Sequence, residues 1–469
     1  MAAPFDRRHP RWRGVRRPLL LLAALAVAGW SAPVGAQQRP ASDPGSDTGS
    51  ASSPAELTGT YRTADGRVLI VWDLVDQMPG GAHQLAAFEP TSGWLRTLHR
   101  DAGDRFAFGQ GWFAPTPREG TISFRPDDGS LQRTGPGGSL EAGRVQIRRR
   151  EVRFASGDVE LAGELVLPPE GTAGSPYPAL VMVPGFGPLT RRTPRIVADQ
   201  FALAGLAVLI HDRRGTGAST GEYVPGAIPD YARDAGAALE FLRARSEVDA
   251  DRVGVMASSL GGLVAPLLHD RDPDWAFFVC RVCPATPAWE QKVVSILHRG
   301  RSAGLEEGDL LDALARKVLT ARYALTRENY DALRSVEAST AGEAWRERVG
   351  DPEDWRPLAE PDAGAWDAYR SVLEVDPGAM LRELEAPVLL ILGEVDGRLP
   401  GDYHAMRARR IFRRTGRPHQ EAWVLPDASH GLMEVRTDST GRRLPFARFV
   451  PEWHDRMVRW VAARVGADR

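Results

Sequence analysis

The feature that most constrains the fold of this chain is a series of short apolar runs after Glu151 that alternates with amphipathic stretches. The runs read ALVMV, LAVLI, RVGVMAS, WAFFVCRV, APVLLILG and EAWVLPD. Strands of a parallel sheet are buried on both faces, so they read as nearly continuous Val, Ile and Leu, and helices connect them. The alternation therefore predicts an α/β fold with a mostly parallel central sheet flanked by helices.

Two further regions have other patterns. Residues 57–148 contain short alternating runs separated by turn sequences such as ADG, PGG and DDG, which predicts a small antiparallel β domain. Residues 284–380 lack strand patterns and contain charged amphipathic stretches, which predicts helices. We expect these helices to form a cap inserted between two parts of the α/β core, residues 149–283 and 381–469.

The beginning of the chain has the composition of an export signal. Within residues 1–36, six arginines precede an apolar run from Leu19 to Ala28 and a small-residue end. The run is shorter than the roughly 20 residues that span a bilayer, and no later segment qualifies. We therefore expect a periplasmic or extracellular protein without a stable membrane span. Residues 37–56 are rich in Pro, Ser, Gly and Asp, which indicates a flexible linker.

The charge of the chain argues against one class of partner. The formal net charge is −2, and loss of the signal with its six arginines and Asp6 lowers it to −7. A mildly acidic protein without a basic block is a poor candidate for nucleic-acid binding.

The chain has two cysteines, Cys280 and Cys283. Residues three apart on an extended strand point to opposite faces, so a disulfide requires the strand to end between them. The pattern favours two unbridged cysteines.

The run RVGVMAS ends at a pair of serines and is followed directly by a helical pattern from Leu260. Such a junction requires a tight turn at Ser259, with small residues two positions before and after it. Ala257 and Gly261 satisfy this requirement, whereas bulky residues would take those positions if Ser258 were the nucleophile. A serine that caps the helix is the simpler alternative.

A serine hydroxyl becomes a strong nucleophile only with a base that an acid orients. Asp396 follows the run APVLLILG, and His430 follows the run EAWVLPD, so both are expected in loops after late core strands. The order Ser259, Asp396, His430 predicts a catalytic triad. Asp427 and Glu394 remain alternative acids.

Backbone amides are expected to bind the oxyanion. One comes from Leu260, directly after Ser259. The loop PGFGPLTRR after the run ALVMV provides the other, with Phe186 as the first candidate and Gly187 in reserve. Glycines in this loop allow the amides to turn inward.

Together these residues resemble the α/β-hydrolase superfamily. The segment 211–223, HDRRGTGASTGEY, is similar to the superfamily pattern D-x-R-G-x-G-x-S-x-G, and PGFGP, ASSLGG, GEVDGRLP and SHGLME follow the expected order. The resemblance runs from about Glu151 to the end of the chain. It is greatest to exported bacterial esterases and acyl-peptidase-like hydrolases with an N-terminal β domain. Pro184, where many relatives have histidine, and Ala257, in place of the first glycine of the turn, depart from the pattern.

The resemblance implies a serine esterase that cleaves a small-molecule acyl ester through an acyl-enzyme intermediate, without metal or organic cofactor. A serine peptidase of the same fold is the alternative. It would need a device for a peptide amine, for which only cap residues such as Glu306 and Glu307 are candidates. A binding protein on an inactive hydrolase fold is a third hypothesis. The oligomeric state is not indicated.

Overall fold

The computed structural model describes residues 51–75, 82–110, 117–350, 355, 357–437 and 443–467. The predicted export signal and most of the predicted linker lie outside the described residues. The described residues belong to one compact unit, residues 43–469. No helix among them combines the length and the apolar character that crossing a membrane requires.

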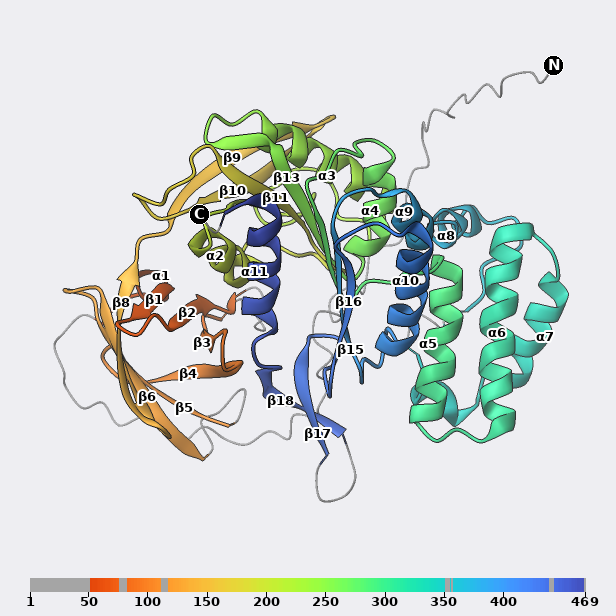
Figure 1. Ribbon diagram of the computed structural model, residues 1–469. Coiled ribbons are helices and arrows are strands. Elements are labelled where there is room, and N and C mark those ends of the chain that lie inside the picture. Colours follow the sequence, from red (N-terminus) through yellow and green to blue (C-terminus); the bar gives the residue numbers. More distant parts are fainter. Residues whose placement is uncertain are drawn as a thin grey trace, which may run out of the picture. The chain divides into compact units, whose positions relative to one another are not determined.

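The core is an eight-stranded sheet with the order β16-β15-β14-β13-β11-β12-β10-β9. Several of its strands are labelled in Figure 1. Neighbouring strands from β11 to β16 pair in parallel, whereas β10 pairs antiparallel with both β9 and β12. The strands are β9 (Arg148–Ser156), β10 (Val159–Leu167), β11 (Tyr177–Val183), β12 (Ala207–His211), β13 (Val248–Ser258), β14 (Phe278–Arg281), β15 (Val388–Gly393) and β16 (Gln420–Leu425).

Helices cover both faces of this sheet, so its central strands are apolar throughout. In β11, Ala179, Val181 and Val183 pack on one face of the sheet with α3, α4, α9 and α10. Leu180 and Met182 pack on the other face with α2 and α11. The helices are α2 (Arg195–Leu203), α3 (Ile228–Arg243), α4 (Gly261–His269), α9 (Pro377–Glu383), α10 (Gly401–Thr415) and α11 (Trp453–Val465).

The N-terminal β domain is an antiparallel, barrel-like sheet. Its eight strands pair in a closed ring because β4 contacts both β3 and β5. The strands are β1 (Gly59–Thr63), β2 (Val68–Asp73), β3 (Leu85–Glu89), β4 (Trp94–Ala102), β5 (Arg105–Gly109), β6 (Arg118–Arg125), β7 (Ser130–Gly135) and β8 (Gly138–Val145).

The alternation along β2 divides its side chains between two cores. Leu69 and Val71 pack inside the barrel, whereas Ile70 and Trp72 pack with residues of the α/β core. The short helix α1 (Pro54–Leu57) precedes the barrel. Ser52, which belongs to the predicted linker, is held against the barrel, because the amide and the hydroxyl of Ser52 both donate to the carboxylate of Asp104.

A hairpin that the sequence did not indicate follows the last core strand. It consists of β17 (Met433–Thr437) and β18 (Arg443–Phe449). Strand β18 joins the barrel sheet beside β4, where Arg448 pairs with Trp94. The amide of Phe449 also donates to the carbonyl of Gly93 over 2.9 Å. The barrel therefore holds the segment that directly follows His430.

Between β14 and β15 the chain is helical, as its pattern predicts. Most of these helices form small apolar clusters of their own. Helix α5 also reaches the core, because Arg299 Nε donates to the carbonyl of Gly397 over 2.7 Å. The elements are α5 (Ala288–Ser302), α6 (Glu307–Thr326), α7 (Tyr330–Thr340), a 3₁₀ helix (Ala344–Glu347) and α8 (Ala365–Leu373).

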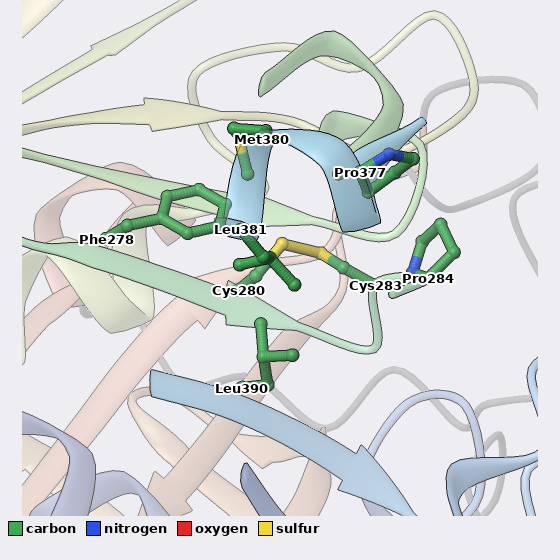
Figure 2. Close-up of a pocket in the computed structure, with 9 residues that line it drawn as sticks. Phe278, Cys280, Cys283, Pro284, Pro377, Met380, Leu381 and Leu390 are labelled. Atoms are coloured by element: carbon green, nitrogen blue, oxygen red, sulfur yellow. A yellow bond between two sulfur atoms is a disulfide. The ribbon is translucent and has the colours of Figure 1, made fainter. Parts of the chain in front are cut away.

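The expectation of unbridged cysteines was wrong. Cys280 and Cys283 form a disulfide, because β14 ends at Arg281 and the next residue, Val282, takes a φ of 50° that turns the chain back. Figure 2 shows the bridge beside Met380 and the end of β14. Both sulfur-bearing residues are buried at 1% exposure.

Candidate active site

Ser259 occupies the turn between β13 and α4. Its φ of 50° is rare for a residue with a side chain, and such a sharp strand-to-helix turn raises the hydroxyl above the sheet edge. The turn is held by two hydrogen bonds, from the Ser259 amide to the carbonyl of Arg281 and from the Gly262 amide to the carbonyl of Ser259. A Cβ at Gly261 would lie 2.7 Å from the carbonyl oxygen of Val183. The close passage of the two backbones therefore requires glycine there.

His430 lies against this hydroxyl. Its Nε2 is 2.9 Å from Ser259 Oγ, and its Nδ1 is 2.7 Å from Asp396 Oδ2. Because a carboxylate only accepts, Nδ1 carries the proton, and Nε2 is free to accept the serine proton. The histidine loop is closed by hydrogen bonds from the Ser429 amide to the Met433 carbonyl and from the Leu432 amide to the Ser429 carbonyl.

Asp396 is fully buried in the loop after β15. Its Oδ1 accepts the amides of Arg398 and Leu399 over 2.8 and 3.0 Å, which leaves Oδ2 for His430. The alternative acids lie elsewhere. Glu394 and Asp427 are both exposed, and Glu394 Oε2 accepts the Asp427 amide. The structure therefore brings together three of the residues that the sequence singled out, Ser259, His430 and Asp396.

The loop after β11, which carries Phe186 and Gly187, passes beside this group. A Cβ at Gly185 would lie 3.5 Å from Ser259 Cβ. Gly187 has a φ of 113°, which a side chain would strain. Within the described residues, the amides of Leu260 and Phe186 donate to no protein oxygen. They are therefore available to an oxygen of a ligand.

A residue that sequence reasoning missed holds this loop. The guanidinium of Arg213 donates to three of its carbonyls, at Pro184, Gly185 and Gly187, over 3.1, 2.7 and 3.2 Å. It lies 4.0 Å from the ring centre of Tyr231, and the residue is 2% exposed. Burial lowers the pKa of Arg213 below the usual arginine value. The motif places Arg213 at a variable position, so its spacing gave no signal.

The residues on either side of Arg213 in the segment 211–223 make contacts that hold this segment in place. Asp212 accepts the backbone amide and the guanidinium of Arg191, each over 2.7 Å. Arg214 forms a two-point ion pair with buried Asp234. These contacts tie the end of β12 to α3 and to the loop after β11, and so fix the position of Arg213.

Ser258 does not share the environment of Ser259. Its hydroxyl accepts two hydrogen bonds from Arg281, at 3.2 and 3.1 Å, and makes no contact with His430. This agrees with the choice of Ser259 over Ser258. In the part of the chain that the structure describes, no three His, Cys, Asp or Glu side chains are grouped as metal ligands.

The core sheet, the turn at Ser259 and the loops at its carboxyl edge define an α/β-hydrolase fold. Residues 174–329 match a family model described as serine aminopeptidase, S33. This match covers a third of the chain. It confirms the resemblance to α/β-hydrolase serine hydrolases and supports hydrolase activity.

Individual relatives align only over short segments. The chain is 32% identical over 114 residues to the uncharacterized protein PA2218 of Pseudomonas aeruginosa, which is 24% of this chain and 30% of that protein. It is 33% identical over 134 residues to the thiohydrolase apmlB of Arthrinium phaeospermum, which is 27% and 43% of the two chains. The chain thus spans less than half the length of either relative.

One of the solved structures to which this chain is similar is the Pyrococcus furiosus esterase Pf2001. It is 18% identical and has a TM-score of 0.39, and the alignment covers 68% of this chain and 91% of the esterase.

Proposed function

We propose that the chain hydrolyses carboxylic esters through an acyl-enzyme intermediate. The observation that carries the proposal is the hydrogen-bonded series of Ser259, His430 and Asp396. His430 takes the proton of Ser259 as the hydroxyl oxygen attacks the acyl carbon, then gives it to the leaving alcohol. A water molecule then attacks the acyl-enzyme while His430 takes its proton, and the proton passes to Ser259 as the acid is released. Asp396 keeps the imidazole in the required tautomer.

The negative oxygen of each tetrahedral intermediate is assigned to the amides of Leu260 and Phe186, with Gly187 in reserve. Their free N–H groups and the approach of Gly185 to Ser259 support this assignment. Fixed amides of this kind stabilise charge as it develops in the transition state.

A charge near the site favours an ester over an amino-terminal peptide substrate. The guanidinium of Arg281 contacts Ser258, one residue before the nucleophile, and no carboxylate of the described chain pairs with it. A positive charge at this place repels a substrate ammonium group. The glutamates that could bind such a group, Glu306 and Glu307, are exposed at the beginning of α6.

The family description makes a serine peptidase the second candidate, so the test includes both substrate types. Wild type and Ser259→Ala are assayed on 4-nitrophenyl esters of two to eight acyl carbons and on aminoacyl 4-nitroanilides. We expect ester turnover that Ser259→Ala reduces at least a thousandfold, and anilide turnover below ester turnover. Faster cleavage of the anilides would replace the esterase proposal with the peptidase. Equal turnover by both proteins would refute catalysis by Ser259.

We also propose that the protein is exported. The composition of residues 1–36 and the Cys280–Cys283 disulfide support this, because structural disulfides persist in oxidising compartments. N-terminal sequencing of the protein from fractionated cells tests it. Cleavage near residue 36 in a periplasmic or secreted fraction is expected, and an uncleaved cytoplasmic protein would contradict it.

A further inference from the structure

Arg281 is the last residue of β14 and lies next to the candidate nucleophile. In the parallel pairing of β13 with β14, Arg281 is the partner of Ser258. The carbonyl of Arg281 accepts the amide of Ser259 over 2.9 Å. The side chains of Arg281 and Ser259 therefore belong to the same carboxyl edge of the sheet.

The contacts of this guanidinium leave its charge unmatched. Nε and one terminal nitrogen donate to Ser258 Oγ, which uses two of the five N–H groups of arginine. Among the described residues no aspartate or glutamate forms an ion pair with Arg281. The residue is only partly buried, so solvent still reaches it.

The buried arginines of the described chain have fixed partners. Three of them pair with carboxylates, Arg96 with Glu119, Arg214 with Asp234 and Arg316 with Glu337, and the fourth, Arg213, donates to three backbone carbonyls. Partial burial of a charge without an opposite charge is unfavourable, because the charge loses some of its hydration. Charged groups with perturbed pKa values cluster at functional sites.

The described surroundings of Arg281 supply no anion. Burial lowers the pKa of Arg281 to about 10, which keeps it protonated at neutral pH. Burial, together with the nearby charge of Arg281, lowers the pKa of His454 well below its usual value. Both ring nitrogens of His454 are buried without a hydrogen-bond partner, and the ring lies among Phe88, Phe449 and Trp453.

From this placement, we propose that Arg281 binds a carboxylate of the substrate, so that the preferred esters carry one free acid group. The proposal rests on the esterase function and names its substrate class. The remaining guanidinium N–H groups match the two oxygens of a carboxylate. Ser258 holds the guanidinium in position, which reduces the entropy lost on binding.

The test uses pairs of esters that differ only in charge. In the first pair, monomethyl adipate carries a carboxylate on the acyl side and methyl hexanoate lacks it. In the second pair, butanoyl glycolate carries a carboxylate on the alcohol side and ethyl butanoate lacks it. Acid release is followed by chromatography at pH 7.5 for wild type, Arg281→Met and Arg281→Lys. Methionine keeps the length of the aliphatic stem, and lysine keeps the charge.

We expect wild type to prefer one acidic ester over its neutral partner at least tenfold in kcat/KM. Arg281→Met loses this preference because its kcat/KM falls at least tenfold more on the acidic ester than on the neutral ester, and Arg281→Lys restores part of the preference. The responding pair identifies the side that carries the carboxylate. Preference for neither acidic ester, or an equal loss on charged and neutral esters in Arg281→Met, would overturn the proposal and leave the esterase function intact.

A binding measurement separates this proposal from the failure of esterase activity. Monomethyl adipate and butanoyl glycolate are titrated calorimetrically into Ser259→Ala and into Ser259→Ala/Arg281→Met. At least tenfold weaker binding of one ligand by the double variant supports the anion site even if no ester is hydrolysed. Equal binding by the two proteins, or none by either, would contradict it.

Discussion

The guanidinium of Arg213 donates to the carbonyl oxygen of Gly185 over 2.7 Å, on the loop that carries the proposed oxyanion amide of Phe186. The two residues are 28 positions apart. Arg213 lies in the loop after β12, and Gly185 lies in the loop after β11. A side chain in the loop after one strand thus fixes the backbone direction of the loop after the neighbouring strand.

Replacement of Arg213 by methionine should therefore reduce catalysis more than binding. Loss of three hydrogen bonds frees the loop, and we expect kcat to fall about 10- to 100-fold with KM changed less than threefold, because loss of an oxyanion donor costs roughly 100-fold or more. Kinetics on a short 4-nitrophenyl ester measure this. Arg245→Met is the matched control, because Arg245 lies 4.3 Å from the ring of Phe241 but has no contact with this loop. Equal losses in both variants would point to general destabilisation.

The contact between Gly93 and Phe449 should support the histidine loop. A Cβ at Gly93 would lie 2.1 Å from the Phe449 carbonyl oxygen, and its φ is 71°. We expect Gly93→Ala to lower the melting temperature by several degrees and kcat by severalfold. Gly66→Ala is the control, since Gly66 has a φ of 87° but no atom within 4 Å of its Cβ position. A similar melting point and kcat in the two variants would exclude a role for this contact.

Buried His404 should make stability depend on pH. Its Nδ1 accepts the Ala285 amide, and burial lowers its pKa to about 4. Between about pH 4 and 6.5 the unfolded chain binds this proton and the folded chain does not, so stability falls as pH decreases through this range. From this one group we expect about 2 kcal/mol less stability at pH 5 than at pH 7.5.

Urea unfolding at the two pH values measures the difference. His404→Gln should show a smaller difference than wild type, while His269→Gln, which changes a partly exposed histidine, should retain it. An unchanged pH dependence in His404→Gln would refute the role of this group.

The disulfide should stabilise the turn at Ser259 through its contact with the first turn of α4. A Cβ at Gly262, in the first turn of α4, would lie 2.5 Å from Cys283 Cβ, so the bridge packs directly against the helix. We expect Cys280→Ala/Cys283→Ala to lose about 2 kcal/mol of stability, as for closure of a very short loop. Thermal melts with and without reductant test this. Reductant should lower the melting temperature of wild type alone, and an equal effect on both proteins would contradict the role of the bridge.

Local sequence patterns were sufficient to select most residues of the candidate site. Ser259 is marked by the small residues Ala257 and Gly261 around a strand-to-helix junction, and Asp396 and His430 follow recognisable apolar runs. These features depend on neighbours in the sequence. The parallel core strands could be predicted for the same reason, because burial on both faces leaves continuous apolar runs.

Features that depend on distant contacts could not be predicted. Cys280 and Cys283 bridge because β14 stops at Arg281, and strand ends are set by the neighbouring loops. The pairing of Arg448 with Trp94 joins segments more than 350 residues apart, so no local pattern marks it. The unmatched charge of Arg281 became visible only when its surroundings were known, since an arginine in a sequence carries no sign of its partners.

The central claim is that Ser259 attacks the acyl carbon with the help of His430. Its most direct test is covalent labelling of the folded protein with a fluorophosphonate, followed by peptide mass spectrometry, in wild type and in Ser259→Ala and His430→Ala. We expect one adduct per chain, on Ser259, with labelling slowed at least a hundredfold in His430→Ala and absent in Ser259→Ala. An adduct on another residue, or equally fast labelling of Ser259 without His430, would contradict the claim.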